Sequence, residues 1–367
     1  MNEFRFRHYG ELDGLRGLAV LLVVLGHLLL FSREGPSDLA ALGVLLFFVL
    51  SGFLITGVLL NDKSARGRIS LSNFYLRRVL RLAPALLIFL AVAAVLIFRR
   101  AIVDVPSYEL IACVLYMRNI FGRSSSLGHL WSLSLEEQFY ALWPCFVSRL
   151  STRPLLFTAA AVTCGVAIAR MVAIQGGWFD YNAAIVYMRP WFRFDSIMIG
   201  CCLCIATTDD VWRERARILV AAIGPALAWL ALLAWTAVAE RIFPTVFLTV
   251  QTMLCVVVLG QLILCPTPVL SLIFTNALLR HLGRISYGLY LWQQLFIANP
   301  HSHWGVLQVF PINVVVSLTI AELSYWLVEV RFLKLKDSFA ERSAPASALR
   351  PRSDLIRCLT HVRDRER

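Results

Sequence analysis

The feature that most constrains this chain is a succession of apolar runs, each close to the length that crosses a lipid bilayer. A membrane-spanning helix needs about 20 mostly apolar residues to cover the hydrocarbon layer. Lipid offers no hydrogen bonds to an open backbone, so such runs are expected to form a helical bundle. This template predicts an all-α, polytopic transmembrane bundle with about ten spans. They lie near residues 15–32, 40–60, 82–98, 130–148, 155–174, 192–208, 216–237, 244–264, 283–299 and 308–329.

The composition supports this class of protein. Hydrophobic residues make up 59% of the chain and charged residues 16%, whereas an ordinary soluble domain is about half apolar and about a quarter charged. A soluble enzyme and a disordered chain are excluded on these values. The net charge of +12 could suggest nucleic acid. The basic residues lie between apolar runs and in a tail, not on one amphipathic face, so no nucleic-acid partner is expected.

The basic residues also predict the orientation, because Lys and Arg accumulate in cytoplasmic segments. With the N-terminus inside, 26 of the 35 Lys and Arg residues fall on the inner side and both termini are cytoplasmic. Residues 107–121 are too short for a span and contain two charges, so we expect a re-entrant or interfacial segment. We divide the chain into a membrane domain, 1–336, and a basic, disordered cytoplasmic tail, 337–367, that can contact anionic lipids.

The first span contains ionisable residues on one face. Arg16 and His27 are eleven residues apart, close to three helical turns, and so are about 16 Å apart along the axis. Asp13 precedes Arg16 by about one turn. The plain alternative for His27 is an interior histidine held by a carbonyl group. Because an ionisable group at membrane depth is costly and by default functional, we favour a functional role.

Three arginines, Arg77, Arg78 and Arg81, stand at the cytoplasmic end of the third run. Spacings of three and four residues make them neighbours on a helix surface, where two guanidinium groups can face one polyanion. Phosphate is the natural ligand of such a pair. The alternative, ordinary positive-inside charge that faces lipid phosphates, stays open at this point.

A polar and aromatic segment enters the fourth run. Glu136, Tyr140 and Trp143 are spaced to form one stripe, and Glu137 points elsewhere. Two adjacent carboxylates at the end of a span form either a surface collar or part of a polar site, and the surrounding aromatic residues favour the site.

No metal site is predicted. The cluster of Cys201, Cys202 and Cys204 has no His or further Cys near it at the spacing of metal ligands. These residues are expected to be buried as small apolar side chains.

These segments together resemble the acyltransferase-3 family of integral membrane acyltransferases, which includes the bacterial O-antigen and exopolysaccharide O-acetylases. The resemblance runs in one order through about residues 11–330, and the combination of motifs is specific. One departure is Gln293, where many members of the family have His. The segments that carry the resemblance are 12–17 with His27, 51–55, 77–84, 129–140, 193–195 and 285–292.

The resemblance implies an O-acyltransferase of the bacterial cytoplasmic (inner) membrane. Such an enzyme transfers an acyl group, commonly acetyl, from cytoplasmic acyl-CoA to a hydroxyl of a carbohydrate or related acceptor, such as a cell-surface polysaccharide or a lipid-linked precursor. Its catalytic candidates here are His27, as the base, and Glu137, with the division of roles between Glu136 and Glu137 left open. The candidates for binding the donor are Arg16, Arg77, Arg78 and Arg81.

A second hypothesis is a transporter or flippase for a glycan or a small molecule, since many carriers combine about ten spans with buried charges. The chain has no internal repeat of the kind that many carriers show, and the combination of His27 with the arginine triad favours the enzyme. A purely structural membrane protein would leave the polar face of the first span without a purpose.

Overall fold

The computed structural model describes residues 9–30, 38–178, 186, 188–242, 244–297 and 305–335. Over these ranges the elements are all helical, as the sequence predicts. The predicted tail, 337–367, lies outside the described residues. In chain order the helices are α1 (Gly10–Leu30), α2 (Asp38–Arg66), α3 (Leu71–Phe98), α4 (Ser107–Val114), α5 (Arg118–Phe121), α6 (Leu130–Arg149), α7 (Thr152–Gln175), α9 (Pro190–Ala206), α10 (Asp210–Ala222), α11 (Pro225–Ile242), α12 (Pro244–Leu264), α13 (Pro268–Phe274), α14 (Ala277–Phe296), the 3₁₀ helix η1 (Gly305–Gln308), α15 (Ile312–Ser324) and the π-helical segment η2 (Tyr325–Glu329).

Six of the described helices are long and apolar enough to cross a membrane, and a seventh span results if the bent pair α10 and α11 is counted as one. The two members of that pair meet at an angle of 72°. The predicted count of about ten spans is therefore not confirmed. The difference arises at helices such as α6 and α14, which carry charged residues and bury much of their length against neighbouring helices. The structure shows a multi-pass helical membrane protein.

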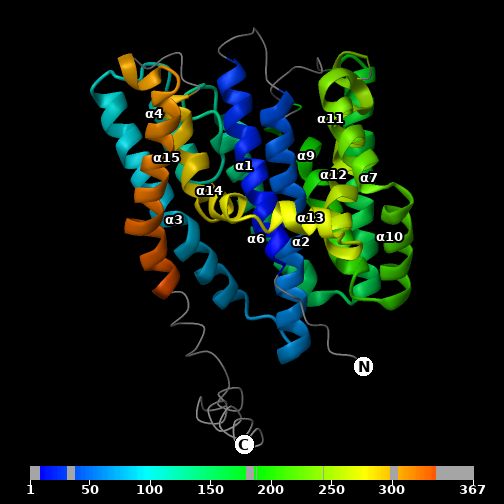
Figure 1. Ribbon diagram of the computed structural model, residues 1–367. Helices are drawn as coiled ribbons and strands as arrows, with labels where there is room; N and C mark the ends of the chain where they lie inside the picture. Colours follow the sequence, from blue (N-terminus) through cyan, green and yellow to red (C-terminus); the bar gives the residue numbers. More distant parts are fainter. Residues whose placement is uncertain are drawn as a thin grey trace, which may run out of the picture.

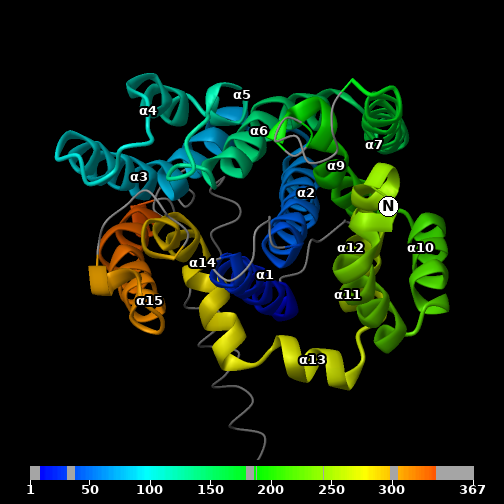
Figure 2. The same ribbon diagram turned by 90° about the horizontal axis from the view of Figure 1, so that it is seen from above.

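Helices α1 and α2 occupy the centre of the bundle, and the other long helices surround them (Figure 2). In the apolar part of α2, 83% of the residues are buried, against 28% in α7 and in the last helix. The peripheral helices therefore present apolar side chains outward, as lipid requires, while α2 is enclosed by protein.

Several glycines allow the central helices to approach their neighbours closely. A Cβ atom at Gly14 would lie 1.9 Å from the carbonyl oxygen of Phe274, and one at Gly283 would lie 2.0 Å from the carbonyl oxygen of Asp13. A Cβ atom at Gly52 would collide in the same way with the backbone of α9. Only glycine permits these backbone contacts, and the contact of Gly283 with Asp13 brings α14 against the polar face of α1.

The segment between α3 and α6, residues 99–128, forms a compact cap that contains the two short helices α4 and α5. The sequence predicts that residues 107–121 do not form a span. The structure agrees, since α4 has 8 residues and α5 has 4. In Figure 1 the cap lies at the upper side, whereas the end of α2, the start of α3 and the end of the last helix lie toward the lower side. The lower side thus carries the arginines at the start of α3.

Candidate active site

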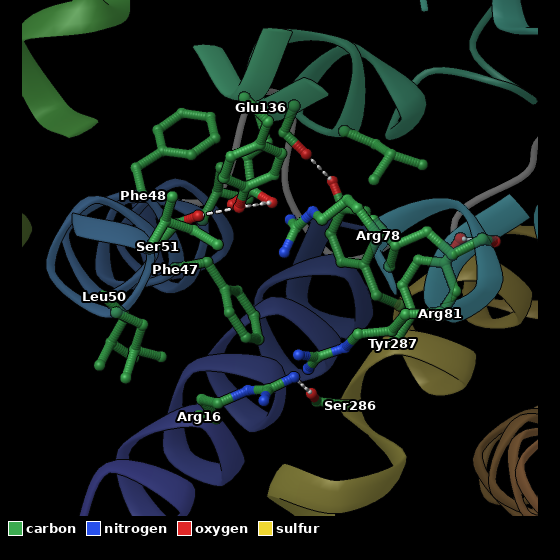
Figure 3. A pocket seen from close by; sticks show the side chains of 18 of the residues that line it. Arg16, Phe47, Phe48, Leu50, Ser51, Arg78, Arg81, Glu136, Ser286 and Tyr287 are labelled. Atoms are coloured by element: carbon green, nitrogen blue, oxygen red, sulfur yellow. Dashed lines mark hydrogen bonds between the residues drawn. The ribbon is translucent and has the colours of Figure 1, made fainter. Parts of the chain in front are cut away.

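A cavity of about 610 Å³ lies among α1, α2, α3, α6 and α14 (Figure 3). Helix α2 lines it with apolar residues such as Phe47, Leu54 and Val58. The other helices contribute polar and charged side chains. Those residues are Asp13, Arg16, Arg78, Arg81, Ser132, Glu136, Tyr140, Ser286, Tyr287 and Tyr290.

Arg78 is held by α6 on two sides. Its guanidinium carbon lies 3.4 Å from the centre of the Tyr140 ring, and its Nε donates a hydrogen bond of 3.3 Å to the Glu137 carboxylate. The Tyr140 hydroxyl donates to Glu136 over 3.2 Å and is also hydrogen-bonded to Ser51. The stacked and paired guanidinium group therefore has a fixed position at the wall of the cavity.

Arg16 and Arg81 complete the positive part of the cavity. Arg16 donates a hydrogen bond of 3.2 Å to Ser286 on α14. Arg81 is close enough to Arg16 and Arg78 for the three charges to repel one another. Arg77 does not line the cavity, and its guanidinium lies 4.0 Å from the carboxylate of Asp62. The fold thus brings together three of the four arginines predicted to bind the donor.

His27 lies toward the other end of α1 and is not part of the cavity lining. Its Nδ1 is 2.9 Å from the side-chain oxygen of Gln293 on α14. In this orientation of the Gln293 amide, its oxygen accepts a hydrogen bond from Nδ1–H, which leaves Nε2 as the basic nitrogen of a neutral imidazole. Gln293, the residue that departs from the family's pattern, is therefore the hydrogen-bond partner of His27.

Tyr290 connects the cavity with this imidazole. It lines the cavity, and its hydroxyl donates to the backbone carbonyl of His129 over 2.7 Å. The His129 ring packs edge-on against Tyr290 and Phe89 and interacts electrostatically with His27. Tyr290 thus joins the lining of the arginine-lined cavity to His129, which is near His27.

Glu137, a predicted catalytic residue, lies beside Arg78 and does not line the cavity, whereas Glu136 does. Sequence reasoning also missed Glu329, which is 7% exposed and interacts electrostatically with Arg81 and Arg16. It ends the π-helical segment η2, a type of irregularity that is frequent at functional sites. A carboxylate at the end of the last apolar run was the signal that could have identified it.

The described residues contain no group of three or more His, Cys, Asp or Glu side chains that could hold a metal ion. Cys201, Cys202 and Cys204 lie on α9 as free thiols, and Cys201 and Cys204 are buried. This agrees with their expected packing role.

Comparison with known proteins identifies the kind of domain. The profile of a family described as an acyltransferase domain, Acyl_transf_3, matches residues 9–325. This match covers α1 through α15 and includes the cavity and His27. No solved structure matches the chain.

Three curated relatives are similar over most of the chain. The peptidoglycan O-acetyltransferase OatA of Listeria monocytogenes is 30% identical over 89% of this chain and 56% of its own length. YrhL of Bacillus subtilis, named "putative peptidoglycan O-acetyltransferase", is 30% identical over 88% of this chain and 54% of its own length. A Staphylococcus aureus protein named "putative O-acetyltransferase" is 29% identical over 90% of this chain and 58% of its own length. The chain therefore spans less than two thirds of the length of these relatives.

Proposed function

The chain belongs to the acyltransferase-3 family, and on this premise we propose that it is a membrane O-acyltransferase that moves an acetyl group from acyl-CoA to a hydroxyl of a carbohydrate. The observation that carries the proposal is the gathering of Arg16, Arg78 and Arg81 from two helices in one cavity, with a histidine of defined tautomer further along α1. The donor and the acceptor approach the reaction centre from opposite ends of this arrangement.

The arginine-lined cavity is the proposed donor site. Coenzyme A carries a diphosphate, and planar guanidinium groups bind phosphate oxygens through paired hydrogen bonds. A volume of about 610 Å³ is within the range of small-molecule sites. The cavity is on the side that holds Arg77 and Arg81, which the positive-inside rule makes cytoplasmic, where acyl-CoA is available. Glu137 then positions Arg78 instead of touching the reacting atoms.

His27 is the proposed general base. Its Nε2 removes the proton of the acceptor hydroxyl as that oxygen attacks the thioester carbonyl. The new C–O bond forms, the C–S bond breaks, and the leaving thiolate takes the proton from the imidazolium. The ester and free CoA are the products, so atoms and charges balance. Gln293 holds the ring with Nε2 available, as the third member of a catalytic triad does.

The proposed acceptor is a hydroxyl of a cell-envelope glycan, presented either lipid-linked within the bilayer or from the cap side. Two of the relatives carry peptidoglycan O-acetyltransferase names, and this supports a glycan. We place the membrane domain at residues 1–336 of a multi-pass protein of the bacterial inner membrane with both termini cytoplasmic. The basic tail, 337–367, then faces anionic lipid headgroups.

The test is His27→Ala in the full chain, with His361→Ala as the matched control because His361 belongs to the basic tail, 337–367. Cells that express each variant are compared by mass spectrometry for the ester-linked acetyl groups of their envelope glycans. We expect His27→Ala to lower acetylation about 10²- to 10⁴-fold, with unchanged acyl-CoA binding by the purified protein. Acetylation near the wild-type level would remove His27 as the base, and glycan export without any acyl change would favour the transporter.

A further inference from the structure

A second hollow, of about 210 Å³, adjoins the donor cavity, and Asp13 lines both. Its other side chains are those of Ala277, Arg280 and Arg284 at the beginning of α14. Both arginines are exposed. No motif of the sequence analysis includes them, and the proposed mechanism does not use them. The hollow is thus a basic site beside the donor cavity that has no assigned ligand.

The two arginines are directed toward the donor cavity by the geometry of α14. Arg280, Arg284 and Tyr287 follow each other at intervals of four and three residues, so they share one helix face. Tyr287 lines the donor cavity. Two residues after Arg284, Ser286 accepts a hydrogen bond from Arg16. The rise of about 1.5 Å per residue therefore puts both arginines within about 10 Å of Ser286 along the axis of α14.

The order of charges matches one end of the donor. From the hollow inward there are two guanidinium groups, then the carboxylate of Asp13, and then Arg16, which Asp13 attracts. Coenzyme A presents a 3′-phosphate, a ribose hydroxyl and a 5′-diphosphate on the same ribose. Guanidinium groups bind phosphates, and carboxylates commonly accept hydrogen bonds from ribose hydroxyls in nucleotide sites. Each group of the nucleotide thus meets a suitable partner.

We propose that Arg280 and Arg284 bind the 3′-phosphate of coenzyme A, with Asp13 facing the ribose hydroxyl. This inference rests on the proposed function, since it names a further part of the donor site. It gives the protein a means to distinguish coenzyme A from acyl carriers that lack a phosphate monoester. The volume of about 210 Å³ accommodates a phosphate group, while the diphosphate occupies the larger cavity.

The experiment compares coenzyme A with 3′-dephospho-coenzyme A as ligands of the purified full chain, by isothermal titration in detergent. We expect the wild type to bind coenzyme A about 10-fold tighter than the dephospho form, because charged hydrogen bonds are lost with the phosphate. The double variant Arg280→Ala/Arg284→Ala is expected to bind both ligands with the wild-type affinity for the dephospho form. Equal wild-type affinities, or a double variant that still distinguishes the ligands, would overturn the inference.

The matched control is Arg213→Ala/Arg217→Ala, which removes two exposed arginines at the same four-residue spacing from α10, outside both hollows. It should keep the wild-type preference for coenzyme A. If the wild type binds neither ligand, the proposed donor itself is wrong. If Arg78→Ala weakens the binding of both ligands and Arg280→Ala/Arg284→Ala weakens the binding of neither, only the inference about the 3′-phosphate is wrong.

Phosphatidic acid also carries a phosphate monoester, so a second titration uses micelles that contain this lipid. Competition between this lipid and coenzyme A at the wild type, but not at Arg280→Ala/Arg284→Ala, would support one shared phosphate site. An effect of the double variant on phosphatidic acid alone, with an unchanged ratio of the two nucleotide affinities, would assign the arginines to lipid and overturn the proposal.

Discussion

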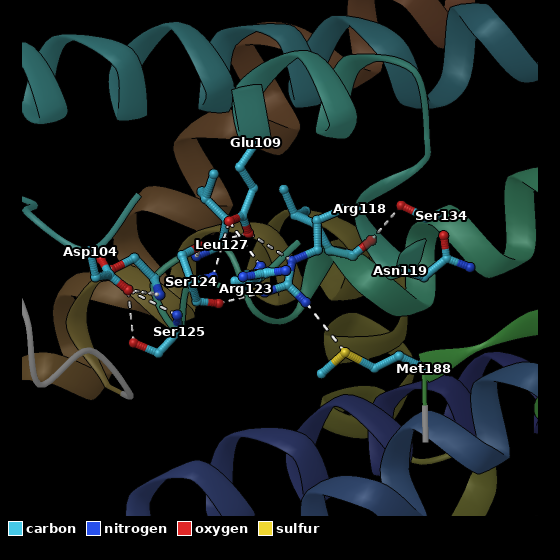
Figure 4. Close-up of polar contacts among 12 residues, drawn as sticks. Asp104, Glu109, Arg118, Asn119, Arg123, Ser124, Ser125, Leu127, Ser134 and Met188 are labelled. Atoms are coloured by element: carbon cyan, nitrogen blue, oxygen red, sulfur yellow. Dashed lines mark hydrogen bonds and ion pairs between the residues drawn. The ribbon is translucent and has the colours of Figure 1, made fainter. Parts of the chain in front are cut away.

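The cap and the donor cavity are both polar regions inside an apolar bundle, but their charges are arranged in opposite ways. In the cap, Glu109 is fully buried and pairs with Arg118 over 3.1 Å (Figure 4). The same carboxylate accepts hydrogen bonds from the backbone of Arg123 and from the backbone and hydroxyl of Ser124. Arg118 also donates to the Ser124 carbonyl. Opposite charges and nearby donors thus satisfy one another.

The donor cavity instead gathers three guanidinium groups around open space. Arg16, Arg78 and Arg81 repel one another across a hollow. Nearby carboxylates, among them Glu136 and Glu329, attract these arginines, and Glu137 accepts a hydrogen bond from Arg78. A saturated polar cluster stabilises a fold, whereas several guanidinium groups that face open space are suited to an anionic ligand. The comparison therefore separates a structural region from a binding region, although both consist of buried charged residues.

The largest expected effect is on the cap. Arg118→Met leaves the Glu109 carboxylate buried without its cation and should lower the free energy of unfolding by about 3–5 kcal/mol. The affinity of the folded protein for acyl-CoA should not change. Thermal denaturation in detergent and acyl-CoA titration measure the two quantities.

The matched control for the cap is the double variant Glu109→Gln/Arg118→Met, which removes the uncompensated charge and should recover part of the lost stability. A stable Arg118→Met protein with weakened acyl-CoA binding would reverse the roles given to the two regions.

The second effect is on the cavity. Arg78→Lys/Arg81→Lys keeps the charge but loses the planar guanidinium groups, so the dissociation constant of acyl-CoA should rise about 10-fold or more. Thermal stability should change little. Arg77→Lys is the control, because Arg77 faces Asp62 outside the cavity. An unchanged affinity in the double lysine variant would mean that these arginines serve membrane topology instead.

The third prediction separates two adjacent amides of α14. Gln293→Leu removes the hydrogen bond to His27 and should lower the transfer rate about 10-fold without changing donor affinity. Gln294 donates instead to the carbonyl of Ser125 in the cap. Gln294→Leu should therefore lower thermal stability and leave the rate nearly unchanged. Equal rates for Gln293→Leu and the wild type would contradict the orienting role of Gln293.

The smallest effect concerns the pH dependence of the cap. Burial raises the pKa of Asp104, but hydrogen bonds from Ser126 and Ser125 lower it more, so the pKa is below the ordinary value. A carboxyl group with a lowered folded-state pKa stabilises the fold above its unfolded pKa of about 4, and this contribution disappears as the pH falls through the folded pKa. Asp104→Asn should destabilise the protein near neutral pH and flatten its loss of stability upon acidification. Melting temperatures of the variant and the wild type that fall in parallel from about pH 6 to pH 3 would contradict this.

The sequence was sufficient for features that depend on local order along the chain. Apolar runs predicted the helices, and the eleven-residue interval predicted that Arg16 and His27 share a face of α1. Spacings of three and four residues predicted that the arginines of α3 are neighbours. The number of spans was less accessible, because helices such as α6 have the length of a span but carry charged residues.

Contacts between distant segments required the tertiary structure. Gln293 was visible in the sequence as a departure from a pattern, but its contact with His27 joins residues 266 positions apart. Glu329 gave no signal beyond its charge, and only the packing of the last helix brings it to Arg81 and Arg16.

The sequence by itself thus determined the class of protein, the helical faces that carry charge and the family, because each depends on residue type and short-range spacing. The tertiary structure decided which of those charges meet. It placed Arg78 against Tyr140, left Arg77 outside the cavity, and put Asp13 between two hollows. The physical reason is that burial, pairing and open space are properties of helix crossings, which glycines such as Gly14 and Gly283 allow.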